Sequence, residues 1–147
     1  MNTEAIRGVI KNDAGDFSGS PNGAAIALVG RLLLSAIFLI SGVGKLAAPA
    51  ATIGYISFAG LPFPQVAYAL AVLMEIVGGV ALIAGYRTRI AAGALAVLCL
   101  VTAFAFHSNF ADPNQFVHFF KNIAAMGGLL QIVAFGAGRL SLDARRR

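Results

Sequence analysis

The chain has 147 residues, of which 59% are hydrophobic and 12% are charged, and its mean hydropathy is +0.82. A soluble domain has about 45–50% apolar and about 25% charged residues, and a domain of this size leaves about a third of its surface exposed. These values exclude a soluble globular domain, and they exclude disorder, which needs low hydrophobicity and high net charge. The single cysteine, Cys99, excludes a disulfide-stabilised secreted domain. The composition predicts a protein whose solvent is the lipid bilayer.

The net charge is +5, from 11 Lys and Arg against 6 Asp and Glu. In a soluble protein this charge would favour nucleic-acid binding. Here the basic residues lie between apolar runs, which is typical of membrane topology, so we expect no nucleic-acid partner.

Residues 1–23 are rich in Asn, Asp, Gly and Ser and have no periodic apolar face, so we expect a flexible polar tail. Four apolar runs follow, at residues 24–46, 66–86, 90–107 and 116–137. Each run is close to the length of about 20 residues that a transmembrane helix requires. The sequence therefore predicts an all-α membrane protein, with residues 24–143 forming an antiparallel bundle of four transmembrane helices. Glycine, alanine and serine within the runs are expected to let the helices pack closely.

Residues 47–65, between the first two spans, contain three prolines and an apolar, aromatic middle. This pattern predicts a short interfacial helix followed by a proline-rich turn.

Basic residues outside the spans determine the predicted orientation. They lie in the N-terminal tail, in the turn between the second and third spans, and after the fourth span, at Arg139 and in the basic C-terminus, residues 144–147. The positive-inside rule therefore places both termini in the cytoplasm, which agrees with an even number of spans.

Polar residues at membrane depth are the candidate functional residues, because a charge inside the bilayer costs at least a few kcal/mol. Glu75 lies near the middle of the second span, and Arg31 lies near the cytoplasmic end of the first. The predicted topology brings five further polar residues together in the outer half: Lys45, His107, His118, Lys121 and Asn122. The sequence therefore predicts a polar pocket that opens outward, with Glu75 at its floor.

These residues also have structural interpretations. Lys45 and Arg31 can extend toward the lipid headgroups, whereas Glu75 is too deep and must be neutral or paired with Arg31, Lys45 or Lys121. His107 can instead cap a helix or lie at the membrane interface, and Asn122 can form a hydrogen bond between helices.

Haem ligation by the two histidines is disfavoured, because it requires imidazoles that face each other across the bundle and His118 lies near a loop. The single cysteine excludes an internal dithiol couple and a cysteine cluster. We expect no metal site.

Short motifs occur along the chain in a specific order and spacing: Gly30–Leu34, Phe38–Gly42, Gly44–Leu46, Gly60–Pro62, Glu75–Gly79, Gly85–Arg89, Phe106–His107, Lys121–Asn122, Gly127–Leu130 and Ser141–Asp143. Together they resemble the DoxX family of small bacterial membrane proteins. The resemblance covers about residues 24–143 and implies a four-helix protein of the bacterial inner membrane. It also implies quinone-linked or oxidative-stress chemistry, since the family is named after a subunit of an archaeal thiosulfate:quinone oxidoreductase. The polar positions of the family pattern fall on residues already identified above: Arg31, Lys45, Glu75, His107, Lys121 and Asn122.

Two functions are compatible with this resemblance. The first is a quinone-interacting subunit of a membrane oxidoreductase, which would need a cofactor or a redox partner protein to carry electrons. Glu75, His107 and Lys121 are its candidate catalytic residues, and its candidate ligand-binding residues are Arg31, Lys45, His118 and Asn122. Five phenylalanines are expected to line the pocket: Phe104, Phe106, Phe116, Phe119 and Phe120.

The second function is a non-catalytic accessory subunit in a larger membrane complex, with Arg31 and Glu75 paired only for stability. The sequence leaves open whether the protein is an enzyme. A solute pathway is disfavoured, because no inverted repeat is evident.

Overall fold

The computed structural model describes residue 3 and residues 19–146. Four long helices form the bundle: α2 (Pro21–Ala47), α4 (Pro64–Ala84), α5 (Thr88–Phe106) and α6 (Pro113–Phe135). Two short helices accompany them, α3 (Pro49–Phe58) after α2 and α7 (Leu142–Arg145) near the C-terminus. All four long helices are long and apolar enough to cross a membrane. The predicted four-helix membrane fold, with a short helix between the first two spans, is confirmed.

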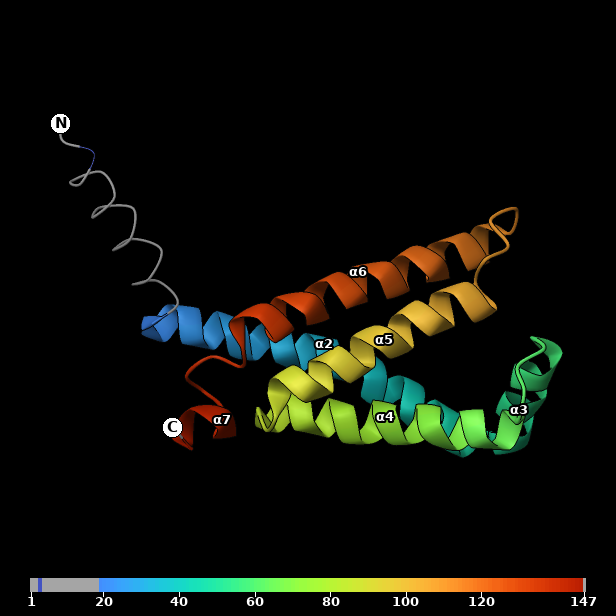
Figure 1. Cartoon of the computed structure of the whole chain (residues 1–147), viewed down its shortest axis with the longest axis horizontal. Coiled ribbons are helices and arrows are strands. Elements are labelled where there is room, and N and C mark those ends of the chain that lie inside the picture. The colour runs from blue at the N-terminus through green and yellow to red at the C-terminus, as the bar shows by residue number, and fades with distance from the viewer. Residues whose placement is uncertain (1–2, 4–18, 147) are drawn as a thin grey trace.

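The helices form two antiparallel pairs, α2 with α4 and α5 with α6 (Figure 1). The two pairs contact each other mainly through α4 and α5. The pairs diverge toward the end that carries α3 (Figure 1). We call this end the α3 end, and the opposite end, where α2 begins and α7 lies, the terminal end. Both ends of the described segment 19–146 lie at the terminal end (Figure 1).

The helix boundaries follow from capping. Proline is the first residue of four of the six helices in the described part of the chain: α2, α3, α4 and α6. Proline suits this position because its missing N–H would have no helical partner there. Two of these helices also have a side-chain cap, since Ser20 Oγ accepts from Gly23 N and Asp112 Oδ1 accepts from Asn114 N. The apolar runs were predicted to begin at residues 24 and 116, because the first turns of α2 and α6 are polar or contain proline. The helices themselves begin one turn earlier, at Pro21 and Pro113.

The predicted tail, residues 1–23, lies mostly outside the described residues, and residues 21–23 belong to α2. At the other end of the chain, the predicted basic C-terminus begins within α7, which a serine caps: Ser141 Oγ accepts from Ala144 N at 3.2 Å. Residue 147 lies outside the described residues.

The core lies along the contact between the two helix pairs and consists of small and aliphatic side chains: Phe38, Leu82, Ala92, Leu95, Ala96, Cys99, Ala125 and Leu129. Glycines within the spans allow close approach at three positions. A Cβ atom would lie 2.8 Å from Ile76 at Gly42, 2.9 Å from Leu95 at Gly78 and 2.8 Å from Leu39 at Gly79. Gly44 and Gly127, by contrast, have open space around them, so only some of the glycines within the spans serve close packing.

Candidate functional site

A partly buried ion pair joins α2 to α4. Lys45 Nζ lies 2.8 Å from Glu75 Oε1 and 2.9 Å from Oε2, and it donates to Ser41 Oγ at 2.6 Å. Ser41 Oγ in turn donates to Glu75 Oε1 at 3.0 Å. Glu75 is only 7% exposed. Of the three partners that the sequence left open for Glu75, the structure selects Lys45.

The local sequence positions this pair. Ser41 and Lys45 are four residues apart on α2 and therefore share one face of the helix. Gly42 lets α4 approach α2 closely, because a Cβ atom there would lie 3.2 Å from the Cβ of Glu75. Tyr68, near the start of α4, donates from its hydroxyl to the Lys45 carbonyl oxygen at 3.2 Å. These contacts hold the ammonium and the carboxylate together.

The ion pair faces a cavity of about 500 Å³ near the α3 end, where the helix pairs diverge. Its lining is mostly apolar and combines side chains from α2, α3, α4, α5 and α6, with His107 directly after α5: Ile37, Phe38, Ile40, Ser41, Lys45, Thr52, Tyr55, Ile56, Glu75, Leu98, Cys99, Thr102, Phe106, His107, Lys121 and Asn122. An apolar cavity with a few convergent polar groups is typical of a small-molecule site.

The histidines form a second polar group at this end. The rings of His107 and His118 are stacked, with their centroids 5.1 Å apart. Lys121 Nζ lies 2.8 Å from His118 Nδ1, and Asn122 Nδ2 donates to the His118 carbonyl oxygen at 2.9 Å. Among the described residues, the buried Nδ1 of His107 has no hydrogen-bond partner. The geometry therefore leaves one buried imidazole nitrogen available beside the cavity.

Electrostatics keep His107 neutral. Burial is the largest cause that lowers the pKa of His107 below 6.5, and the nearby His118 and Lys121 lower it further. A neutral imidazole has one donor and one acceptor nitrogen. His107 can therefore donate to a carbonyl oxygen or accept from a hydroxyl group near pH 7.

The structure brings five of the seven predicted site residues into one cavity lining: Lys45, Glu75, His107, Lys121 and Asn122. His118 lies beside them through its ring contact with His107. Of the phenylalanines expected there, only Phe106 lines the cavity, so that prediction is largely wrong. The other four pack against one another or against Phe110 in a separate cluster: Phe104, Phe116, Phe119 and Phe120.

Arg31 lies away from this cavity, at the terminal end. Its side chain is 2% exposed and Nη2 donates to the Leu140 carbonyl oxygen at 2.5 Å, so it contacts the segment that leads into α7. Gly85 makes room for it, because a Cβ atom there would lie 2.1 Å from Arg31 Nη1 and 2.4 Å from the Cβ of Ser141. Arg31 therefore holds the C-terminal segment against the bundle, and it does not pair with Glu75.

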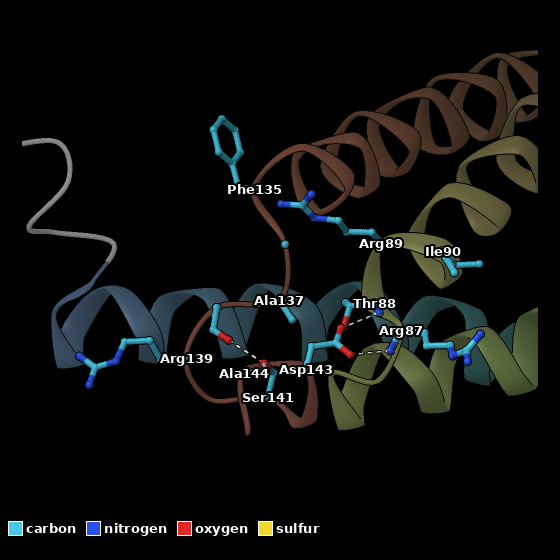
Figure 2. A pocket seen from close by; sticks show the side chains of 12 residues that line it. Arg87, Thr88, Arg89, Ile90, Phe135, Ala137, Arg139, Ser141, Asp143 and Ala144 are labelled. Carbon is cyan, nitrogen blue, oxygen red and sulfur yellow. Dashed lines mark hydrogen bonds between the residues drawn. The ribbon is translucent and has the colours of Figure 1, made fainter. Parts of the chain in front are cut away.

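Asp143 is a structural residue that the pattern of apolar spans could not identify. Its carboxylate accepts from Arg87 N and Thr88 N, both at 2.8 Å, and from Thr88 Oγ1 at 2.7 Å, so it caps the start of α5 (Figure 2). Burial alone would raise the pKa of Asp143, but these hydrogen bonds and the charge of Arg146 lower it below 3.8. The sequence signal for this cap was Ser141–Asp143, which the family resemblance contained without assigning it a role.

Tyr55 and Cys99 are two of the lining residues that the sequence did not predict. Tyr55 on α3 stacks on Phe106 with ring centroids 5.3 Å apart, so α3 closes one side of the cavity. Cys99 lines the same cavity from α5. Tyr55 belongs to the apolar, aromatic middle of residues 47–65, and only the docking of α3 brings it to the cavity. Within residues 19–146, no group of three or more His, Cys, Asp or Glu side chains could hold a metal ion.

Comparison with known proteins agrees with this architecture. The family model for DoxX matches residues 26–108. Inner membrane protein YqjF of Escherichia coli (strain K12) is 38% identical over 116 residues, which is 79% of this chain and 88% of the relative. Inner membrane protein YphA of the same organism is 30% identical over 126 residues, or 82% of this chain and 89% of the relative. No solved structure matches the chain significantly.

The family model covers more than half of the chain, and both relatives are aligned over most of their length. Their descriptions and the four apolar helices support a multi-pass protein of the bacterial inner membrane. The chain belongs to the DoxX family of inner membrane proteins.

Proposed function

We propose that the cavity at the α3 end binds the headgroup of a quinone and that the protein is a quinone-interacting subunit of a membrane oxidoreductase. The observation that carries this proposal is the convergence of Lys45, Glu75, His107, Lys121 and Asn122 on one largely apolar cavity. A quinone ring is flat and apolar with two carbonyl oxygens, so it needs such a lining and a few hydrogen-bond donors.

The residues fit this ligand in three respects. A cavity of about 500 Å³ lies within the range of about 300–1,000 Å³ typical of ligand sites. Tyr55 and Phe106 provide an aromatic wall. The buried Nδ1 of His107, which has no partner in the described chain, is a polar atom that a ligand can satisfy.

Each polar residue has a distinct role in this proposal. His107, Lys121 and Asn122 hold the carbonyl oxygens, because all three side chains can donate hydrogen bonds. The Lys45–Glu75 pair holds an exchangeable proton at the cavity wall. A bound quinone would accept two electrons from a redox partner and two protons through these side chains. The partner supplies the electrons, as a separate cofactor or protein does in other redox systems.

Orientation is the second part of the proposal. Basic residues gather at the terminal end, in the first turn of α5 or outside the spans: Arg87, Arg89, Arg139, Arg145 and Arg146. By the positive-inside rule this end faces the cytoplasm, so the cavity lies in the outer half of the membrane. Quinone would reach it from the lipid phase near that face.

Equilibrium binding of a fully methyl-substituted benzoquinone to the purified full-length protein tests this function. Such a quinone has no free ring position for addition of the Cys99 thiol. We expect saturable binding that Glu75→Gln, His107→Ala and Asn122→Ala each weaken. Gln131→Ala is the matched control for Asn122→Ala, because Gln131 is an exposed amide on α6 that does not line the cavity. Unchanged binding by Glu75→Gln and His107→Ala would show that the site assignment is wrong.

The alternative function, a non-catalytic accessory subunit, is supported by one observation. The Glu75 carboxylate already accepts from Lys45 and Ser41, as expected for a purely structural ion pair. Purification in mild detergent, followed by native mass spectrometry, distinguishes the two functions. A larger complex that fails to assemble without this protein, combined with no quinone binding by the protein, would favour the accessory function.

A further inference from the structure

The cavity at the α3 end extends to the surface of the bundle that faces lipid. Ile37 and Ile40 of α2 line this cavity, although they are 43% and 74% exposed. Gly42 marks the side of α2 that contacts α4, because a Cβ atom there would lie 2.8 Å from Ile76. With 3.6 residues per turn, Ile37 and Ile40 lie about 140° and 160° around the helix from Gly42. The two isoleucines therefore border an opening on the side of α2 that faces away from α4.

The opening lies between α2 and α6, which make few contacts with each other. The two helices approach closely near the middle of α2, where a Cβ atom at Gly128 would lie 3.3 Å from Leu34. Lys121 lies seven residues before Gly128 on α6, nearer the α3 end and on the same helix face. At that level α6 lines the cavity through Lys121, which is exposed. We call the gap bordered by Ile37, Ile40 and Lys121 the side opening.

The side opening lies at the depth of the lipid acyl chains. Ile40 and Ile37 precede Ala47, the last residue of α2, by 7 and 10 residues. At the helical rise they lie about 10 and 15 Å inside that end of α2. The 27 residues of α2 span about 40 Å, whereas the hydrocarbon core of a bilayer is about 30 Å thick. A centred helix would extend about 5 Å beyond the core at each end, so the opening leads into hydrocarbon and not into water.

The cavity and the side opening together match an amphiphile. Lys45, His107 and Asn122 provide polar groups within the cavity, and Ile37 and Ile40 provide an apolar border where it meets the lipid. A purely polar ligand would have to cross the acyl chains to enter by this route. An amphiphile can enter with its polar ring first and leave its tail among the acyl chains, so no apolar group is transferred into water.

We propose that the side opening holds the hydrocarbon tail of a long-chain membrane quinone and that Ile37 and Ile40 select for this tail. The inference rests on the proposed function, because it assigns the ring of the same quinone to the cavity at the α3 end. The tail passes between α2 and α6 into the bilayer. The substrate class is therefore quinones that carry a long alkyl or isoprenoid chain.

Binding of two quinones to the purified full-length protein in neutral detergent tests the proposal. The first is the fully methyl-substituted benzoquinone, and the second carries a decyl chain in place of one methyl group. Ile40→Trp places a larger side chain at the side opening. We expect this variant to weaken binding of the decyl quinone on the order of tenfold more than binding of the tail-free quinone. All proteins are compared at one detergent concentration, so partitioning of the decyl chain into micelles cancels.

Leu33→Trp is the matched control for Ile40→Trp. Leu33 is 67% exposed and lies seven residues before Ile40, on the same face of α2, but it does not line the cavity. This control should bind both quinones like the unaltered protein. The two Trp variants should also unfold at the same temperature, because both positions are exposed.

A photoreactive group at the end of the decyl chain gives an independent measurement of where the tail lies. We expect labelling of peptides that contain residues 33–40 of α2 or 121–128 of α6. Labelling confined to residues 48–63 or 107–112, at the α3 end of the bundle, would place the tail outside the side opening and overturn the proposal.

The binding results separate failure of this inference from failure of the proposed function. If the unaltered protein binds both quinones but Ile40→Trp weakens both equally, or neither, the tail does not occupy the side opening and only this inference is overturned. If the unaltered protein binds neither quinone saturably, the proposed function is wrong and the inference fails with it. Loss of co-purified phospholipid in Ile40→Trp, with unchanged binding of the decyl quinone, would assign the opening to a lipid acyl chain and also overturn the proposal.

Discussion

Lys45 and Glu75, 30 residues apart in the chain, form an ion pair in which one ammonium group contacts both carboxylate oxygens, at 2.8 and 2.9 Å. The pair joins α2 to α4 at the wall of the cavity, where Glu75 is 9% and Lys45 26% exposed at the side chain. Removing one partner would therefore leave a poorly solvated charge without compensation.

The first prediction follows from this pairing. Lys45→Met should destabilise the folded protein by about 3 kcal/mol, because the Glu75 carboxylate loses its counter-ion. The double variant Lys45→Met/Glu75→Gln should recover part of that loss. Thermal unfolding in mild detergent measures both. Lys121→Met is the control for removal of an ammonium group, since Lys121 lies on the same cavity but is exposed and has no carboxylate partner among the described residues. Equal destabilisation in the single and double variants would contradict the coupling.

A second prediction concerns Gly85, which has φ +66° and lies against Arg31 and Ser141. Gly85→Ala should cost more than the 1–2 kcal/mol or so that a left-handed conformation imposes on alanine, because the added methyl group displaces the Arg31 guanidinium. Gly60→Ala is the matched control, since Gly60 has φ +76° and open space around it. The difference in unfolding temperature between these two variants measures the cost of displacing Arg31 and Ser141, which hold the C-terminal segment against the bundle. No difference would mean that Arg31 does not hold the C-terminal segment.

A third prediction concerns Asp143 as the cap of α5. Asp143→Asn should weaken the start of α5 by about 1 kcal/mol, because an amide replaces a carboxylate that accepts three hydrogen bonds. The pKa of Asp143 is lower in the folded state than in the unfolded state. Its contribution to stability is therefore complete at a pH above the usual pKa of aspartate, and it is lost as the pH falls through the folded-state pKa. Hydrogen exchange at Arg87 and Thr88 should increase in the variant and not in Asp112→Asn, which changes the cap of α6. Unchanged exchange would contradict the capping role.

A fourth prediction follows from the lowered pKa of His107. The causes are burial first and then the charges of His118 and Lys121, so Lys121→Gln should raise the pKa of His107 without fully restoring it. Because the folded state favours the neutral ring, the stability that His107 contributes should decline as the pH falls below about 6.5. Histidine NMR titration in detergent measures the pKa, with His118→Gln used to assign the resonance. A pKa of His107 at or above 6.5 would contradict the burial of this ring.

Much of the fold could be predicted from the sequence, because a span needs only a long apolar run and four such runs are present. The grouping of Lys45, Glu75, His107, Lys121 and Asn122 was also predictable, since an antiparallel topology determines which polar residues share one half of the membrane.

The parts that could not be predicted depend on packing between segments far apart in the sequence. Arg31 binds a carbonyl 109 residues away, at Leu140, and neither helical periodicity nor charge reveals that contact. Asp143 caps α5 from the C-terminal segment for the same reason. The sequence limited the possible ion-pair partners of Glu75 to three basic residues. That Lys45 is the partner depends on how α2 and α4 pack against each other, which the sequence does not reveal.

Photoaffinity labelling with a light-activated, fully substituted benzoquinone tests the central claim most directly. The account predicts that saturable labelling falls on the cavity wall, in the peptides that contain residues 37–45 and 98–107, and that excess unlabelled quinone suppresses it. Glu75→Gln should reduce this labelling, whereas Gln131→Ala should not. Labelling that is not saturable, or that falls on the lipid-facing residues of α4 such as Leu70 and Val77, would contradict the claim that this cavity binds quinone.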